Sequence, residues 1–359
     1  MRTTDFSLKY EERVIFQLRR LYQQYGYAQY RMSKFEEYEL YARNKSFLVS
    51  EHILTFTDID GKLLALKPDV TLSIIKNSQS GSSLQKVYYN ENVYRTAPTS
   101  LGYREIMQAG LECIGDLDQY AICEVVELAA RSLETIDRNY LLDLSHMGMV
   151  SGLLDAMGWE DRQQILTLIA EKNIPAVRTM CSDADVCPNY TELLCRLMEL
   201  YGSPAQVLPE LECMTVNEQM KTALNTLRSV CLALASYQNN LRLDFSIVND
   251  MNYYNGIIFR GYLPGLASGV LAGGQYDNLL QRMGKSGQAI GFAVYMDQLE
   301  RYERAEKEFD VDVLLLYREN VDSITVSGEA NELRKNGLSV RVERTVPAGL
   351  RYRMLREVE

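Results

Sequence analysis

Two polar residues and a glycine alternate in the apolar segment 108–114: Gln108, Gly110 and Glu112. Successive side chains of a β-strand point to opposite faces, so these three would share one face of a strand. An amide and a carboxylate beside a glycine could hold a small polar ligand. Because buried polar groups are costly without partners, we favour a ligand pocket, although a core strand with internal partners would show the same alternation.

Two further patterns carry weaker signals. The tripeptide GKS at 284–286 resembles the end of a phosphate-binding loop, but Leu279 occupies the position of the required glycine and no strand leads into it. His146 lies near Ser145 and Asp143, yet sequence neighbours rarely form a catalytic triad. We therefore reject the phosphate loop and interpret His146 as a core or strand-end residue.

The residues around the 108–114 segment predict the elements that would position it. Apolar side chains at helical spacing predict a helix over 10–25. Residues 53–67 predict a β-hairpin with a type I′ turn at Asp60-Gly61, because that dipeptide tolerates positive φ angles. Residues 87–94 are apolar, β-branched or aromatic, so they predict a strand antiparallel to 108–114 across a longer loop.

Residues 151–240 show helical periodicity and predict a mostly helical insertion. Strand character returns at 241–262 and 289–295. These patterns predict an α+β fold, in which an antiparallel sheet is flanked by helices and residues 1–307 form the core domain.

Residues 308–359 stand apart as a short C-terminal segment. Strands predicted at 311–317 and 338–343, around a helix at 329–336, make a small βαβ unit. Such a segment is short for a domain, and we expect its arginine-rich end to be partly flexible.

Composition narrows the classes of function. The formal net charge of −10 disfavours tight nonspecific binding to nucleic acid, and no apolar run reaches the roughly 18 residues of a membrane span. Seven cysteines without a CxxC pair, with two histidines, are typical of a reduced, cytoplasmic protein. We expect no structural metal, because a zinc site would need closer ligand spacing.

Four segments, in the right order along residues 10–303, resemble the motifs of class II histidyl-tRNA synthetases. They are 88–95 followed by 102–115, which resembles motif 2 with Arg95 as its arginine; 66–71, which resembles the amino-group-binding segment; 252–256, which resembles the histidine-specific tyrosine segment; and 272–279 continuing to 291–293, which resembles the glycine-rich run into motif 3. One such match would be weak, whereas four in order are specific.

This resemblance implies a pocket for histidine. Carboxylates suit the ammonium group, and an acceptor with a phenol suits the two ring nitrogens. The implied ligand-binding residues are Asp69 and Thr71 for the amino group, Gln108 for the polar end, Glu112 and Tyr254 for the ring, Tyr253 beside the ring, and Arg95 or Arg104 for the carboxylate.

The same resemblance implies that catalysis has been lost. Activation of an amino acid by ATP needs cations that hold the triphosphate and neutralise the transition state. Ala97 replaces the motif 2 glutamate, Asn249 replaces the catalytic arginine of the tyrosine segment, and Gln298 replaces the motif 3 arginine. We therefore expect no catalytic residues, no cofactor and no adenylation.

A kept amino-acid pocket, lost cations and a short C-terminal segment together make the chain similar to the ATP phosphoribosyltransferase regulatory subunit family. That resemblance implies a noncatalytic partner of a short-form catalytic subunit in histidine biosynthesis, with L-histidine as feedback effector. It also implies a homodimer, formed through the N-terminal region, within a hetero-oligomer, although Ser33 stands where motif 1 has a proline. No tRNA is expected, because 308–359 would supply only the start of an anticodon-binding domain.

Two alternatives stay open. A divergent histidyl-tRNA synthetase would catalyse pyrophosphate exchange that depends on ATP and histidine. A sensor of uncharged tRNA would need a basic face. The negative net charge and the short C-terminal segment argue against both alternatives.

Overall fold

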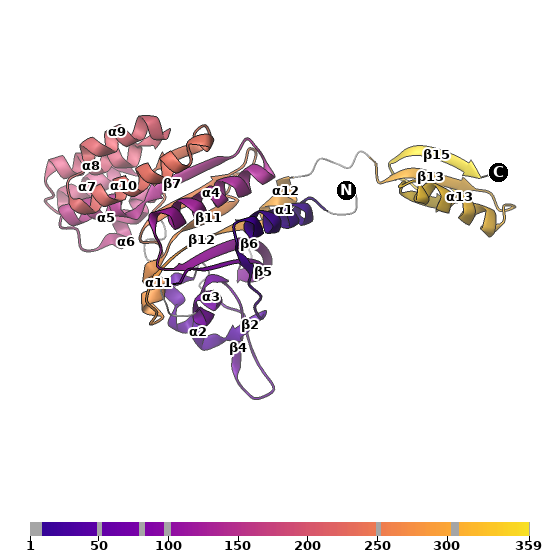
Figure 1. Ribbon diagram of the computed structural model, residues 1–359, viewed down its shortest axis with the longest axis horizontal. Helices are drawn as coiled ribbons and strands as arrows, with labels where there is room; N and C mark the ends of the chain where they lie inside the picture. The colour runs from indigo at the N-terminus through magenta and orange to yellow at the C-terminus, as the bar shows by residue number, and fades with distance from the viewer. Residues whose placement is uncertain are drawn as a thin grey trace. The chain divides into compact units, whose positions relative to one another are not determined.

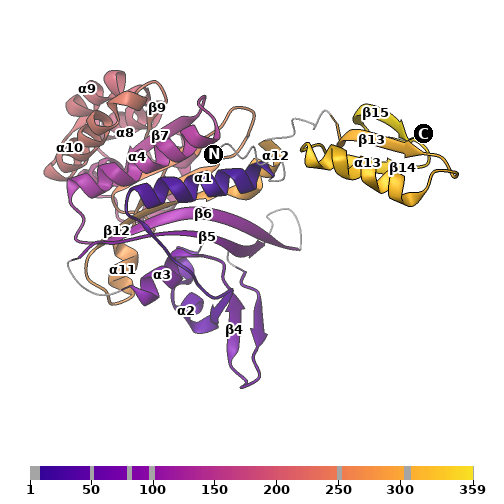
Figure 2. The ribbon, with the colours of Figure 1, turned by 45° about the vertical axis from the view of Figure 1, so that its right-hand side comes forward.

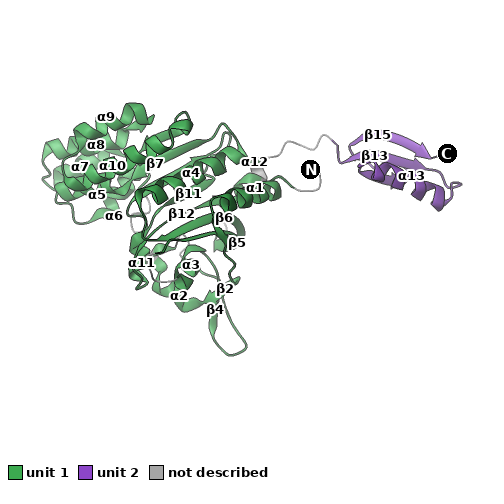
Figure 3. Ribbon diagram, viewed as in Figure 1, with its two compact units in different colours: residues 1–302 green, residues 303–359 purple. Residues whose placement is uncertain are grey.

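The computed structural model describes residues 9–48, 52–78, 83–96, 102–248, 253–302 and 309–358. The chain divides into two compact units, residues 1–302 and residues 303–359 (Figure 3). Within the described ranges, no helix combines the length and the apolar character needed to cross a membrane.

Nine strands of the described first unit form one sheet, in the order β1-β5-β6-β12-β11-β10-β7-β9-β8 (Figure 1). They are β1 (Ala28–Gln29), β5 (Gln85–Thr96), β6 (Tyr103–Gly115), β7 (Leu141–His146), β8 (Tyr201–Gly202), β9 (Leu241–Asp244), β10 (Ile257–Tyr262), β11 (Leu271–Gln275) and β12 (Gln288–Tyr295). Neighbours are antiparallel apart from two parallel pairs, β1 with β5 and β7 with β9. The α+β class is confirmed, and so is the antiparallel pairing of 87–94 with 108–114.

Helices cover both faces of this sheet (Figure 2). One face carries α1 (Tyr10–Gln24) and α4 (Gln119–Ile136), with α12 (Met296–Tyr302) beside α1, and the other carries α3 (Thr71–Asn77) and α11 (Asp277–Arg282). The helix predicted over 10–25 is α1, whose buried residues Val14, Leu18 and Leu21 follow helical spacing. Each face therefore builds its own apolar core.

A smaller sheet, in the order β2-β4-β3, lies next to α3 in the sequence. Its region comprises β2 (Phe35–Glu37), α2 (Tyr38–Arg43), η1 (Lys45–Phe47), β3 (Thr55–Thr57) and β4 (Leu63–Leu66). The hairpin of β3 and β4 is present, but the predicted type I′ turn is wrong, because Gly61 has a positive φ of 79° and Asp60 does not. The Asp58 carboxylate accepts hydrogen bonds from the backbone of Asp60 (2.9 Å) and Lys62 (2.8 Å), which stabilises a longer loop.

Most of the segment between β7 and β9 is helical. Its elements are α5 (Met147–Ala156), α6 (Arg162–Ala170), α7 (Ile174–Asp183), α8 (Pro188–Glu199), α9 (Pro204–Met214), α10 (Glu218–Ala233) and η2 (Ala235–Tyr237). The side chains of Asp161, Asn173 and Asn217 accept backbone hydrogen bonds at the starts of α6, α7 and α10, as N-caps do.

The described part of the second unit is a parallel sheet, in the order β14-β13-β15, packed against one helix. Its elements are β13 (Val311–Tyr317), α13 (Ser323–Lys335), β14 (Val340–Glu343) and β15 (Tyr352–Val358). The helix begins at Ser323 rather than at 329, because the Asp322 carboxylate caps its first N–H groups. The arginine-rich end, expected to be partly flexible, instead forms β15 beside β13.

Lys285, from the tripeptide rejected as a phosphate loop, contacts the C-terminal end of α3. Its ammonium group donates to the Lys76 carbonyl (3.0 Å), to Ser78 Oγ (3.1 Å) and to the Ser78 carbonyl. The last carbonyls of a helix have no partner within the helix. Lys285 therefore satisfies acceptors that would otherwise need water.

We expect Lys285→Ala to lower the free energy of unfolding of the first unit by about 1–2 kcal/mol, because these acceptors lose a charged donor. Urea unfolding followed by the fluorescence of Trp159, the single tryptophan, measures this change. Lys221→Ala is the matched control, since that exposed ammonium makes a surface ion pair with Glu218, and should cost less than about 0.5 kcal/mol. Equal effects of the two substitutions would contradict the role of Lys285.

Candidate functional site

A cavity of about 360 Å³ lies on the sheet face that carries α3 and α11. Sites for small molecules are commonly of this size. Seven of the eight residues singled out in the sequence line it: Asp69, Thr71, Arg95, Gln108, Glu112, Tyr253 and Tyr254. The eighth, Arg104, pairs with Arg95 across β5 and β6 but is exposed and does not line the cavity.

Small residues of adjacent strands make the floor of the cavity. Gly110 of β6 pairs with Ala293 of β12, and Glu112 pairs with Gly291. A Cβ atom at Gly291 would overlap Oε2 of Glu112. The Glu112 carboxyl group therefore fits only because its neighbour across the strands has no side chain.

Glu112 is a deeply buried polar group of the site, with 2% of its surface exposed. Its carboxyl group accepts a hydrogen bond from Thr71 Oγ1 (2.9 Å) and another from the Tyr276 hydroxyl (2.5 Å). Burial raises the pKa of Glu112 to about 8, and the two hydrogen bonds oppose this rise. At neutral pH the group is therefore mostly protonated, and it can take part in hydrogen bonds as donor or acceptor.

Asp69 and Arg95 form a second polar group at the start of α3. The Asp69 carboxylate accepts a hydrogen bond from the backbone of Leu72 (3.0 Å), and Arg95 Nε donates to the Pro68 carbonyl (2.9 Å). Burial raises the pKa of Asp69, whereas the guanidinium of Arg95 opposes that shift. The two side chains thus compensate each other's charge in part.

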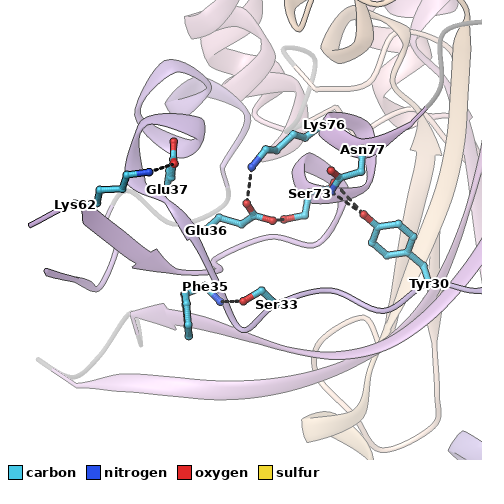
Figure 4. Close-up of polar contacts among 9 residues, drawn as sticks. All are labelled: Tyr30, Ser33, Phe35, Glu36, Glu37, Lys62, Ser73, Lys76 and Asn77. Carbon is cyan, nitrogen blue, oxygen red and sulfur yellow. Dashed lines mark hydrogen bonds and ion pairs between the residues drawn. The ribbon is translucent and has the colours of Figure 1, made fainter. Parts of the chain in front are cut away.

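Helix α3, which carries Thr71, is held in place by the small sheet (Figure 4). Glu36 of β2 accepts a hydrogen bond from Ser73 Oγ (3.1 Å) and forms an ion pair with Lys76 (2.7 Å). Asn77 donates to the hydroxyl of Tyr30 (2.9 Å). Contacts along the length of α3 therefore fix where its first turn meets the cavity.

Aromatic rings form a wall beside Glu112. The ring of Tyr253 lies 4.7 Å from that of Tyr254 and 5.6 Å from that of Tyr276, between centroids. Tyr276 and Tyr89, which also line the cavity, were missed by the sequence prediction. Tyr276 lies within the glycine-rich segment 272–279, so a tyrosine beside these glycines was the signal that could have identified it.

The remaining residues singled out in the sequence fall elsewhere. Gln298 accepts a hydrogen bond from Ser268 (3.0 Å) and donates to Asp297 (3.1 Å), outside the cavity lining. Nδ1 of His146 accepts a hydrogen bond from the backbone of Gly148, which caps α5. Ala97 and Asn249 lie outside the described residues, as does residue 252. Within the described ranges, no cluster of three His, Cys, Asp or Glu side chains could hold a metal ion.

We expect Glu112→Gln to flatten the pH dependence of stability. Burial raises the pKa of Glu112 from 4.5 to about 8 on folding. The stability contributed by its protonated form is therefore complete below pH 4.5 and is lost as the pH rises towards 8. The free energy of unfolding of the native chain should fall by up to about 1.4 kcal/mol per pH unit in this window, and that of the variant by less.

Urea unfolding at several pH values between about 5 and 8 measures this difference. Glu105→Gln, at an exposed position of the same strand, is the control and should keep the native slope. Parallel pH curves for Glu112→Gln and the native chain would show that the carboxyl group ionises normally.

Comparison with known proteins places this chain in a family. Residues 6–299 match the sequence profile of the histidyl-tRNA synthetase family. The ATP phosphoribosyltransferase regulatory subunit of Acetivibrio thermocellus is 28% identical over 352 residues, which cover 94% of this chain and 83% of that protein.

Two solved structures share the fold. An ATP phosphoribosyltransferase regulatory subunit/histidyl-tRNA synthetase from Bacillus halodurans aligns with a TM-score of 0.78 at 24% identity, over 97% of this chain and 93% of that one. The ATP phosphoribosyl transferase (HisG:HisZ) complex from Thermotoga maritima aligns with a TM-score of 0.63 at 18% identity, over 81% of this chain and 98% of that one. The profile match spans well over half of the sequence, so the chain belongs to the histidyl-tRNA synthetase family.

Proposed function

We propose that this chain is the noncatalytic regulatory subunit of ATP phosphoribosyltransferase, and that its cavity binds L-histidine as feedback effector. The proposal rests on the buried contact of Glu112 with Tyr276, in a chain whose curated relatives are such subunits. Phosphoribosyl transfer, the first step of histidine biosynthesis, belongs to a separate catalytic chain. Histidine shifts the complex towards a less active state if it binds that state more tightly.

The polar groups of the cavity suit both ends of histidine. The carboxyl group of Glu112 can accept the N–H of the imidazole ring, and the wall of tyrosines provides hydroxyl groups and apolar ring faces. Asp69, beside the Thr71 hydroxyl, offers a carboxylate for the ammonium group. Gln108 lies on the same strand face as Glu112 and adds an amide.

The cavity suits ATP poorly. Among the described residues its lining includes two arginines, Arg95 and Arg260, and Arg95 is engaged by Pro68 and Asp69. The positions of two charged residues of the family are occupied by Asn249 and Ala97. Holding a triphosphate and neutralising its transition state require several cations, so a divergent synthetase is disfavoured.

The proposed partner is a short-form catalytic subunit of ATP phosphoribosyltransferase, in the cytoplasm. The fold shared with the HisG:HisZ complex supports a chain that works in a hetero-oligomer. We further propose that two copies form a homodimer through the N-terminal region. The net charge of −10 argues against tRNA as a partner.

Mixing this protein with a short-form catalytic subunit tests the function directly. We expect phosphoribosyl-ATP formation to be faster in the mixture than with the short form alone, and L-histidine to slow the mixture. Incubation of this protein alone with ATP, histidine and labelled pyrophosphate should give no exchange into ATP. A mixture no faster than the short form, or measurable exchange, would overturn the assignment.

Gly291→Ala tests whether the cavity is the histidine site. The added methyl group would overlap the Glu112 carboxyl group and lie 2.5 Å from the Leu111 carbonyl oxygen, so thermal melting first shows whether the variant is folded. In the folded variant we expect histidine affinity, measured by isothermal titration calorimetry, to fall about fivefold to tenfold, the loss of one hydrogen bond. Gly328→Ala is the matched control, because a Cβ there meets nothing within 4 Å. Unchanged affinity in Gly291→Ala would place histidine elsewhere.

A further inference from the structure

Strand β15 lies at an edge of the described C-terminal sheet, with β13 as its neighbour on one side. Most of its seven residues are exposed, and an edge strand presents N–H and C=O groups that another strand can pair with. We propose that β15 pairs antiparallel with β15 of a second copy of this chain, so that the two C-terminal sheets join into one. This inference goes beyond the proposed function, because it depends on neither the ligand nor the catalytic subunit.

The backbone groups at the outer edge of β15 come from alternate residues. The Arg351 carbonyl accepts a hydrogen bond from the N–H of Val311 in β13 (3.3 Å). Because the backbone groups of successive strand residues point to opposite sides, Met354 and Arg356 direct theirs away from β13. In an antiparallel pair centred on Leu355, Met354 therefore exchanges two hydrogen bonds with Arg356 of the second copy.

The exposed side chains of β15 match one another in this register. Arg353 lies opposite Glu357 of the second copy, and Glu357 lies opposite Arg353, so the pair contains two contacts of opposite charge. Opposite charges directly across two strands stabilise their pairing, and like charges destabilise it. Leu355 meets Leu355 of the second copy at the two-fold axis, whereas a slip of two residues would place it opposite a charged residue. The strand sequence therefore specifies both the partner and the register.

Leu355 lies on the sheet face opposite α13. That helix packs on Val313 and Leu315 of β13. Side chains alternate along a strand, so Leu314, and Leu355 paired with it, point to the other face. Leu355 has 42% of its surface exposed. Contact with its own copy would cover this apolar side chain at the centre of the strand pair.

The other edge strand of this sheet, β14, is less suited to pairing. It has four residues, and Arg341 forms an ion pair with Glu343 of the same strand (2.8 Å). Arg334 of α13 donates to the Val340 carbonyl (3.2 Å), which occupies one acceptor of β14. Short strands are one means by which natural sheets prevent edge-to-edge pairing. The longer β15 is therefore the edge at which a second copy is expected.

Cysteine cross-linking of the full chain tests the proposal. Strands of this length make an interface below the standard size, so the association is weak and a covalent trap suits it. In Leu355→Cys the two thiols would meet in a non-hydrogen-bonded pair with Cα atoms about 4.5 Å apart, a separation that a disulfide spans. We expect mild oxidation to link this variant into dimers.

Two controls measure linking by random collision. Arg353→Cys places an exposed thiol on the same strand, but its copy would lie roughly 13 Å further along the pair, so it should not link. The native chain shows the background from its seven cysteines. A Leu355→Cys variant that stays unlinked, or that links no faster than Arg353→Cys, would overturn the proposal.

Charge substitutions in the Leu355→Cys variant test the register. Glu357→Arg places arginines opposite each other at two points, so linking should slow at least about fourfold as attraction becomes repulsion. Adding Arg353→Glu returns opposite charges to both contacts and should restore the rate. Rates that do not respond to either change would show that β15 does not pair in this way. Thermal melting of each variant shows whether it is folded.

Discussion

The site depends on one constraint: a carboxyl group buried against strands that have almost no side chains beneath it. Glu112 is accommodated because Gly291 has no side chain. Its carboxyl group accepts hydrogen bonds from a hydroxyl group of α3 and from one in the turn before α11. Burial without a counter-charge keeps the proton on the carboxyl group near neutral pH. A ligand that brings an N–H group or a positive charge would relieve that cost, which is why this corner of the fold suits the ring of the proposed ligand.

Binding and turnover need different charges, and the proposed function requires the groups for binding alone. Thr71, Gln108 and Glu112 contribute donors and acceptors that match an amino acid, whereas phosphate chemistry needs an excess of positive charge around the nucleotide. Asp69 and Arg95 offset each other, which lowers the field that a triphosphate would experience. These groups suit the proposed role of the cavity, in which a small metabolite is bound and not changed.

Features of the site that arise within one strand or one turn could be predicted from the sequence, and features that arise between strands could not. Alternation along β6 predicted Gln108 and Glu112, because strand periodicity is a local property. The other five predicted lining residues came from the resemblance of four ordered motifs to those of a known family. Arg260 and Tyr276 reach the cavity only through the strand order β6-β12-β11-β10, which brings distant segments together. Similarly, the turn after Asp58 depends on a side-chain cap, and β15 depends on a partner strand, so neither followed from residue types alone.

The glycines of the sheet restrict how this protein can evolve. At Gly274 a Cβ atom would lie 2.7 Å from the Ile257 carbonyl oxygen, and at Gly273 and Gly291 it would meet a neighbouring side chain or backbone even more closely. At Gly273 and Gly274 the clash is with the backbone or with neighbouring side chains of the sheet, so a larger residue is excluded whatever ligand the cavity holds. Changes in ligand specificity are therefore open to the cavity's walls, while the floor keeps its shape.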